Sequence, residues 1–341
     1  MKRKQWLYSL IFVLLIGLTV FTICSQSASF TREGFWEYVR AAHPAGLAAA
    51  ALCTLLYILL EGLALLAICR ALGYRRSVGQ GVLYSAADIY FSAITPSATG
   101  GQPASAVLMM RSGIPAAPTA VALLINLVLY TLSILLMAAA GLALHPGLLK
   151  LFGPASRILI WVGAGTQVAL LAGLTLLIFH EPIFLRLADW ALKIGHKLHL
   201  IRDIESRKQK YAELRDDYQQ CSGALRRQWK LILLSFVVNL AQRLAIVLSP
   251  VCVYLAEGGN RARIGEAFAA QTMVILGSNA VPLPGSVGVA DYLFLDGYRS
   301  LAQSPVLLEL LSRAISFYSC VVLCGALLLV YAAKRKLSKE R

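Results

Sequence analysis

Long apolar stretches, separated by short polar segments, run through most of the 341-residue chain. Each holds roughly 20 residues or more, which is the length that an α-helix needs to cross the hydrocarbon core of a membrane. We therefore predict six membrane-spanning helices, at about residues 5–24, 44–69, 117–144, 156–180, 231–255 and 306–331. The first is expected to be retained, because it is long for a signal peptide and lacks a convincing cleavage site.

Two helix-breaking segments interrupt the apolar pattern, TPSATGG around Pro96 and LPGSVGV around Pro284. The two prolines are 188 residues apart, and so are Gly100 and Gly288. Proline lacks a backbone donor and glycine loosens the chain, so neither segment suits the middle of a regular helix. Inside a membrane, such a backbone is tolerated only where it faces protein or a polar cavity.

The arms on either side of each break are too short to cross a membrane comfortably, which predicts broken helical hairpins at 79–111 and 264–298. We favour re-entrant hairpins, and a pair of tilted spans is the alternative. The first would enter from the cytoplasm and the second from outside, giving two inverted repeats at about 44–145 and 229–332. Paired interruptions of this kind point to a transporter's binding site. The predicted fold is an all-α integral membrane protein, a polytopic helical bundle that forms one domain over residues 1–341.

Two polar segments are expected to lie at the membrane surface. Residues 25–43 contain Trp36 and Tyr38, which suggests an external loop with an interfacial helix. A basic cytoplasmic loop at about 181–230 begins with a helix that has one apolar face, as helices in the bilayer interface do.

Composition and charge agree with a membrane protein. The chain is 58% hydrophobic and 14% charged, whereas soluble proteins carry about 25% charged residues. A net charge of +15 is compatible with nucleic-acid binding, but the basic residues gather at the ends of the spans. Predicted cytoplasmic segments hold 23 of the 32 Lys and Arg residues, external segments seven and the spans two. This bias follows the positive-inside rule, places both termini in the cytoplasm and argues against nucleic acid as a partner.

Catalytic and metal-binding motifs do not stand out. The seven cysteines lie almost wholly in apolar segments without a Cys-x-x-Cys pair, so we expect them to be packing residues. His196 and His199 share a helical face but have no third ligand nearby. Neither a nucleophile elbow nor a phosphate-binding loop occurs. We expect no cofactor and no metal, and the sequence leans against an enzyme.

Among the ionisable side chains inside the predicted spans and hairpins, we single out Glu61, Asp88, Arg243, Asp291 and Arg313. Charged groups are costly in hydrocarbon, so each is a functional candidate. One interpretation is a polar cavity between the repeats that accepts a charged head group. The structural alternative is a Glu61–Arg243 ion pair, with the other three side chains nearer the membrane surface.

The glycine-rich turns suggest a site for phosphate. After Gly100 and Gly101 a new helix is expected to start, with Pro103 in its first turn, where proline costs no hydrogen bond. The free N–H groups and the positive end of the helix dipole suit an anion. Ser286 and Gly288 are expected to build the same feature in the second repeat.

The chain resembles the lysylphosphatidylglycerol synthase transmembrane-region family in three motifs and one arginine: TPSATGGQP at 95–103, RSGI at 111–114, VPLPGSVGVAD at 281–291, and Arg313. The resemblance covers about residues 5–335. That family is the flippase-like membrane part of the multiple peptide resistance factor and also occurs as stand-alone proteins. It implies a bacterial inner-membrane protein that moves an anionic or aminoacylated phospholipid, such as lysyl-phosphatidylglycerol, or a related lipid phosphate between leaflets.

Three positions depart from the family pattern. Many relatives have an acidic residue and then an arginine just after the paired glycines, where this chain has Gln102 and Ser105. Asp291 stands at a position that is usually glutamate. The chain shows no counterpart of the soluble aminoacyl-transferase domain, so a phosphatidylglycerol lysyltransferase activity is not expected of it alone.

The leading hypothesis is a flippase-like lipid transporter, in which the arginines attract phosphate, the carboxylates balance them or meet a cationic head group, and the glycines shape the site. The candidate substrate-binding residues are Arg243, Arg313, Glu61, Asp88, Asp291, Gly100, Gly101, Gln102, Gly285, Ser286, Gly288, Arg111 and Asn126. The second hypothesis is a membrane component of aminoacyl-phospholipid synthesis that relies on a separate transferase. The third is a structural or partner-binding membrane protein. The oligomeric state stays open, with a homodimer among the alternatives.

Overall fold

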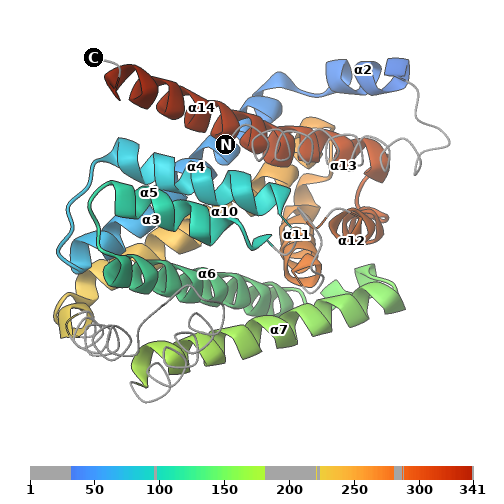
Figure 1. Cartoon of the computed structure of the whole chain (residues 1–341). Helices are drawn as coiled ribbons and strands as arrows, with labels where there is room; N and C mark the ends of the chain where they lie inside the picture. The colour runs from blue at the N-terminus through green and yellow to red at the C-terminus, as the bar shows by residue number, and fades with distance from the viewer. Residues whose placement is uncertain are drawn as a thin grey trace, which may run out of the picture.

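The computed structural model describes residues 32–95, 98–180, 220, 223–279, 286 and 288–339, and all regular elements in these ranges are helical (Figure 1). The predicted span at 5–24 and most of the predicted basic loop at 181–230 lie outside the described residues, so neither is tested here. The helices are α2 (Arg32–Ala41), α3 (Pro44–Ala71), α4 (Val78–Ile94), α5 (Gly101–Arg111), α6 (Ala116–Leu144), α7 (Pro154–Phe179), α10 (Trp229–Ala256), α11 (Ile264–Ser278), α12 (Val289–Tyr298), α13 (Pro305–Arg313) and α14 (Ser319–Lys339).

Five helices in the described ranges are long and apolar enough to cross a membrane: α3, α6, α7, α10 and the continuous helix Pro305–Arg335 that contains α13 and α14. They coincide with the second to sixth predicted spans, and α2 forms the expected helix in 25–43. The last span differs in one respect, because a π-helical segment, η5 (Ala314–Tyr318), joins α13 to α14. Such segments occur often at functional sites.

Helices α3 and α10 pack against each other in antiparallel orientation along their length. Near the start of α3, a Cβ atom on Gly46 would lie 2.7 Å from Cβ of Ala256, which ends α10. Towards the other end of α3, Ser235 Oγ donates a hydrogen bond of 2.9 Å to the Ala64 carbonyl. Small residues at this contact let the backbones approach closely, as is common between membrane helices.

Each broken hairpin returns to the end of the molecule where it began. In the first, the hydroxyl groups of Tyr84 on α4 and Ser112 after α5 share a hydrogen bond at the hairpin base. In the second, Tyr298 of α12 donates a 2.9 Å bond to the Ala267 carbonyl of α11. Helix α5 has 11 residues and is about 16 Å long at 1.5 Å per residue, about half the hydrocarbon thickness. This geometry favours the re-entrant form, and which side of a membrane each hairpin leaves from stays a prediction.

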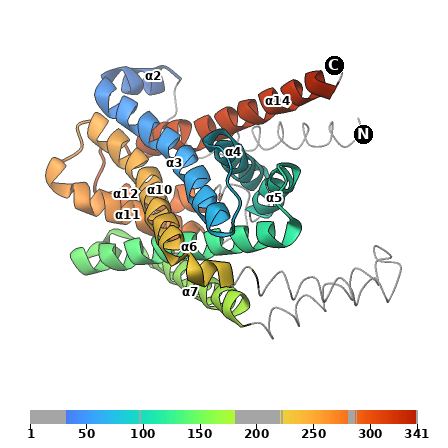
Figure 2. The same cartoon turned by 90° about the vertical axis from the view of Figure 1, so that its left-hand side faces the viewer.

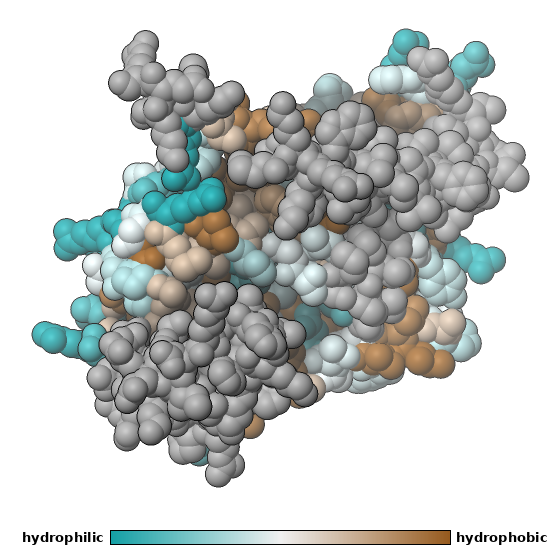
Figure 3. All heavy atoms as spheres, in the orientation of Figure 1, coloured by the Kyte–Doolittle hydropathy of each residue, from teal (hydrophilic) through white to brown (hydrophobic). Residues whose placement is uncertain are grey.

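The hairpins enter from opposite ends of the molecule, as Figures 1 and 2 show. Helix α4 follows the end of α3 and α11 follows the end of α10, and these ends point in opposite directions. At the end where α3 terminates, the exposed basic side chains include Arg70, Arg75, Arg111 and Lys230. Figure 3 shows hydrophilic residues, drawn in teal, along the left edge of the molecule. Positive-inside reasoning assigns this end to the cytoplasm, which remains a prediction.

The order of elements is duplicated along the chain. The first residues of α10, α11, α12 and α13 follow those of α3, α4, α5 and α6 by 185, 186, 188 and 189 residues. Packing is reciprocal, because α4 contacts α14 while α11 contacts α6. Ala98 and Ser286, 188 residues apart in the two turns, both adopt a positive φ of 53° and 52°. These regularities support the predicted repeats, and their inversion across a membrane remains a prediction.

The first hairpin depends on a close approach at Gly101. A Cβ atom there would overlap Ser92 Oγ and Asp88 Oδ1 of α4. We expect Gly101→Ala to separate α5 from α4 and to cost about 1–3 kcal/mol through overpacking, which lowers the thermal unfolding midpoint in detergent by a few degrees. Gly79→Ala, on α4 of the same hairpin, is the matched control, since no atom of a neighbouring element lies within 4 Å of its added Cβ. Equal midpoints for the two variants would contradict this account.

Candidate functional site

A cavity of about 900 Å³ lies in the centre of the bundle, between the two hairpin tips. Its wall combines residues of α3, α4, α5, α6, α7, α10, α11, α12, α13, η5 and α14 with residues of both turns. Pockets of roughly 300–1,000 Å³ hold small molecules in proteins. The charged residues lining it are Glu61, Asp88, Arg243, Glu309 and Arg313. Because it lies among helices of membrane-spanning length, these charges mark it as the candidate functional site.

The first charged cluster is built around Glu61 of α3. Its carboxylate accepts hydrogen bonds from Asn126 Nδ2 at 2.8 Å and from Gln242 Nε2 at 2.6 Å. Asn239 Nδ2 in turn donates to Asn126 Oδ1 at 3.1 Å. Neutral amides from α6 and α10 therefore satisfy most of the hydrogen-bonding capacity of the carboxylate, and Arg243 Nη2 approaches it only to 3.8 Å.

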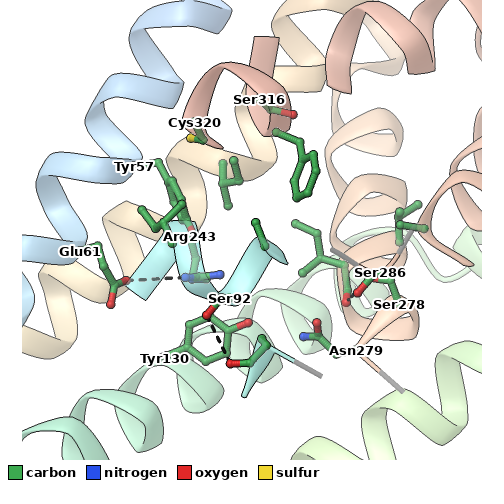
Figure 4. A pocket seen from close by; sticks show the side chains of 18 of the residues that line it. Tyr57, Glu61, Ser92, Tyr130, Arg243, Ser278, Asn279, Ser286, Ser316 and Cys320 are labelled. Carbon is green, nitrogen blue, oxygen red and sulfur yellow. Dashed lines mark hydrogen bonds and ion pairs between the residues drawn. The ribbon is translucent and has the colours of Figure 1, made fainter. Parts of the chain in front are cut away.

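Arg243 rests mainly on aromatic rings. Its Cζ atom lies 3.8 Å from the ring centroid of Tyr130 and 5.5 Å from that of Tyr57. Figure 4 labels the three side chains in the wall of the cavity. Its Nε atom donates to Gln242 Oε1 at 2.6 Å. Aromatic faces attract a guanidinium group without neutralising its charge. The positive charge of Arg243 is therefore only loosely balanced, and it faces the cavity.

The second charged cluster surrounds Arg313 and binds its guanidinium group tightly. Arg313 Nη2 forms an ion pair with Asp291 Oδ1 of α12, and Nε contacts Glu309 Oε1 one helical turn earlier at 2.7 Å. The side chains of Arg313 and its two partners are 12% exposed or less. The two arginines thus differ: Arg243 has Glu61 at 3.8 Å and Asp88 within electrostatic reach, whereas Arg313 has two carboxylates in direct contact.

The helix N-termini at the hairpin tips each face an aspartate. Asp88 of α4 lies against Gly101, the first residue of α5, and its Oδ1 atom is buried without a hydrogen-bond partner in the described part of the chain. Asp291 Oδ2 accepts the N–H of Gly288 at 2.8 Å and so caps α12. Gly288 has a φ of 85°, which favours glycine. A carboxylate therefore stands beside each position where the sequence suggested phosphate.

The structure gathers most of the predicted site residues but not all of them. Asp88 and Arg313 line the same cavity as the Glu61–Arg243 pair, so they do not lie apart near a surface. Gln102, Asn126 and Ser286 also line it, whereas Gly100, Gly101 and Gly288 shape the helix starts behind the wall. Arg111 is exposed at the base of the first hairpin and is not among the residues that line the cavity, so its place in the site stays a prediction. Gly285 lies outside the described residues.

Sequence reasoning missed Glu309, Tyr57, Tyr130 and Gln271, which all line the cavity. A usable signal was the spacing of four residues, which puts two side chains on the same helical face. This spacing occurs in three pairs: Tyr57–Glu61, Asn126–Tyr130 and Glu309–Arg313. Within the described ranges, no group of three or more His, Cys, Asp or Glu side chains is arranged to hold a metal ion.

These features define a polytopic helical membrane protein with a charged cavity between two broken hairpins. Residues 6–324 match the family described as lysylphosphatidylglycerol synthase TM region, and the chain belongs to this family. The chain is thereby linked to lysylphosphatidylglycerol biosynthesis or transport. It matches no curated protein and no solved structure significantly.

The two arginines should differ in their contribution to stability. Arg313→Gln leaves two buried carboxylates without a cation, which we expect to cost about 3–5 kcal/mol. Arg243→Gln leaves Glu61 with its two amide donors, so we expect a smaller loss of about 1–3 kcal/mol. Thermal unfolding of the purified variants in detergent checks this order. Adding Glu309→Gln to Arg313→Gln should recover part of the loss, and equal losses for the two single variants would contradict the assignment.

Proposed function

We propose that this protein is a flippase-like transporter that moves an anionic or aminoacylated phospholipid between the leaflets of the bacterial inner membrane. The observation that carries the proposal is the charged cavity, which is lined by the tips of two hairpins that enter from opposite ends of the molecule. Binding sites of many transporters lie at such a junction of broken helices between repeats.

Arg243 is the proposed anchor for the lipid phosphate. It faces the cavity, is 6% exposed and has its nearest carboxylate at 3.8 Å. A phosphate can therefore bind its guanidinium group without first breaking a close ion pair, and such contacts are among the strongest hydrogen bonds in proteins. Tyr57 and Tyr130 hold the side chain in place and offer their rings to the remainder of the head group.

Carboxylates outnumber arginines in and beside the cavity. Glu61, Asp88, Asp291 and Glu309 face two guanidinium groups, those of Arg243 and Arg313. This excess of acidic groups suits a head group that carries a positive charge as well as phosphate, as an aminoacylated phosphatidylglycerol does. The charge pattern and the family together support lysyl-phosphatidylglycerol as the first substrate to test.

The duplicated hairpins suggest how a lipid head group passes through the cavity from one leaflet to the other. Ser92 of the first hairpin and Ser278 of the second both line the cavity, and in Figure 4 Ser278, Asn279 and Ser286 lie across it from Arg243. In the proposed cycle, movement of one hairpin opens the cavity towards one end while the other hairpin keeps it closed. The acyl chains stay in the bilayer while the head group crosses through the cavity.

Two other functions are alternatives to the proposed lipid transport. The family description favours a membrane component of lysylphosphatidylglycerol synthesis that works with a separate transferase. Formation of lysyl-phosphatidylglycerol by the purified protein from lysyl-tRNA and phosphatidylglycerol, alone or with such a partner, would support that function. A purely structural role predicts a dry, packed interior, which the polar cavity argues against.

Lipid translocation in proteoliposomes tests the proposal. We expect leaflet exchange of labelled lysyl-phosphatidylglycerol by the wild-type protein and slower exchange by Arg243→Gln. Losing a hydrogen bond to a charged group costs about 1.5–3 kcal/mol, or about tenfold to hundredfold in rate. Arg263→Gln is the control, because Arg263 pairs with Glu266 on the exterior, with side-chain exposures of 31% and 35%. Wild-type exchange by folded Arg243→Gln protein would refute the role of Arg243.

A further inference from the structure

Two carboxylates contact Arg313, and its single positive charge can balance only one of them. Asp291 of α12 and Glu309 of α13 both contact its guanidinium group. The two acidic residues are only 7% and 6% exposed. With all three groups ionised, the cluster would hold a net negative charge away from water.

Two buried carboxylates this close cannot both ionise without a large electrostatic cost. The groups that act on Glu309 are Arg313 on its own helix and Asp291 on α12, and Tyr318 of η5 lies near Arg313. Helices α2 and α10 also pack against α13, and among the described residues neither sets a charged group against Glu309. The surplus charge therefore has to be neutralised by an ion from outside the cluster.

Of the two carboxylates, Glu309 is the better candidate to bind the neutralising ion. Asp291 has two donors, Arg313 Nη2 and the Gly288 N–H at the start of α12, a helix end that favours negative charge. Glu309 accepts a hydrogen bond from Arg313 Nε at 2.7 Å and lies beside the Asp291 carboxylate, which opposes a second negative charge there. A metal cation would need several oxygen ligands, and here the guanidinium group already binds both carboxylates. A proton needs only one oxygen atom.

We propose that lipid movement through this cavity is coupled to a proton carried by Glu309, an inference that rests on the proposed flippase function. When Glu309 is ionised, it occupies Nε of Arg313. When a proton from the donor side binds the Glu309 carboxylate, the carboxylate releases Nε, and the phosphate of the lipid takes its place. On the acceptor side the proton leaves to water, Glu309 rebinds Arg313 and the phosphate is expelled. Lipid phosphate and proton therefore move in the same direction.

Infrared spectroscopy of the purified protein tests the protonation step without any transport. We expect the wild type to gain the carbonyl band of a buried protonated carboxyl group as the pH is lowered. Glu309→Gln, which keeps the shape of the protonated acid, should lose this band. Glu266→Gln should keep it, because Glu266 pairs with Arg263 where both side chains are about a third exposed. A spectrum of Glu309→Gln that retains the whole band would overturn the assignment.

A pH gradient across proteoliposomes tests the coupling. Wild-type translocation away from the acidic side should accelerate by up to about tenfold per pH unit, as expected for one titrating group. In Glu309→Gln, whatever translocation remains should no longer follow the gradient, while Glu266→Gln should respond like the wild type. Wild-type translocation that ignores pH, or that follows a sodium gradient instead, overturns the coupling and leaves the flippase function standing. No translocation under any gradient overturns the flippase function and the coupling with it.

Discussion

The antiparallel contact between α3 and α10 determines where the other described elements lie. Gly46 meets Ala256 at one end, and Ser235 bonds to Ala64 towards the other. Because the two helices run in opposite directions, α4 and α11 start at opposite ends of the molecule. Their arms are too short to cross, so both hairpins turn near the middle, and their broken tips face one cavity. Exposed polar backbone is thereby kept where a membrane protein can tolerate it.

The charged residues of the cavity form two units, one around Arg243 and one around Arg313. The units differ in how closely carboxylates neutralise the arginine. Arg243 is held by tyrosine rings and amides, which leaves its charge available to a phosphate. Arg313 is bound by Asp291 and Glu309, so an anion reaches it only when a carboxylate gives way. In the proposed transport, the Arg243 unit is the anchor and the Arg313 unit is a gate that depends on charge. This division of roles is the physical basis for both the proposed transport and its proposed link to protons.

Much of the fold follows from simple features of the sequence. Apolar length predicts the five described spans, and the Pro and Gly positions around Pro96 and Pro284 predict the hairpins. The site was harder to predict, since its details depend on contacts between distant segments. Nothing in the local sequence shows that Glu309 shares its arginine with a residue of α12, or that Asp88 faces the start of α5. The π-helical segment after Arg313 likewise reflects packing rather than a local motif.

The account depends most on the claim that one cavity serves both faces of the membrane. Impermeant thiol labelling of Ser92→Cys and Ser278→Cys, in a protein whose native cysteines are replaced by alanine, tests this most directly. Both serines line the cavity, one on each hairpin. We predict that each engineered cysteine is labelled from either side of oriented vesicles, and that substrate lipid slows the labelling. Labelling of both positions from only one side, or from neither, would contradict the account.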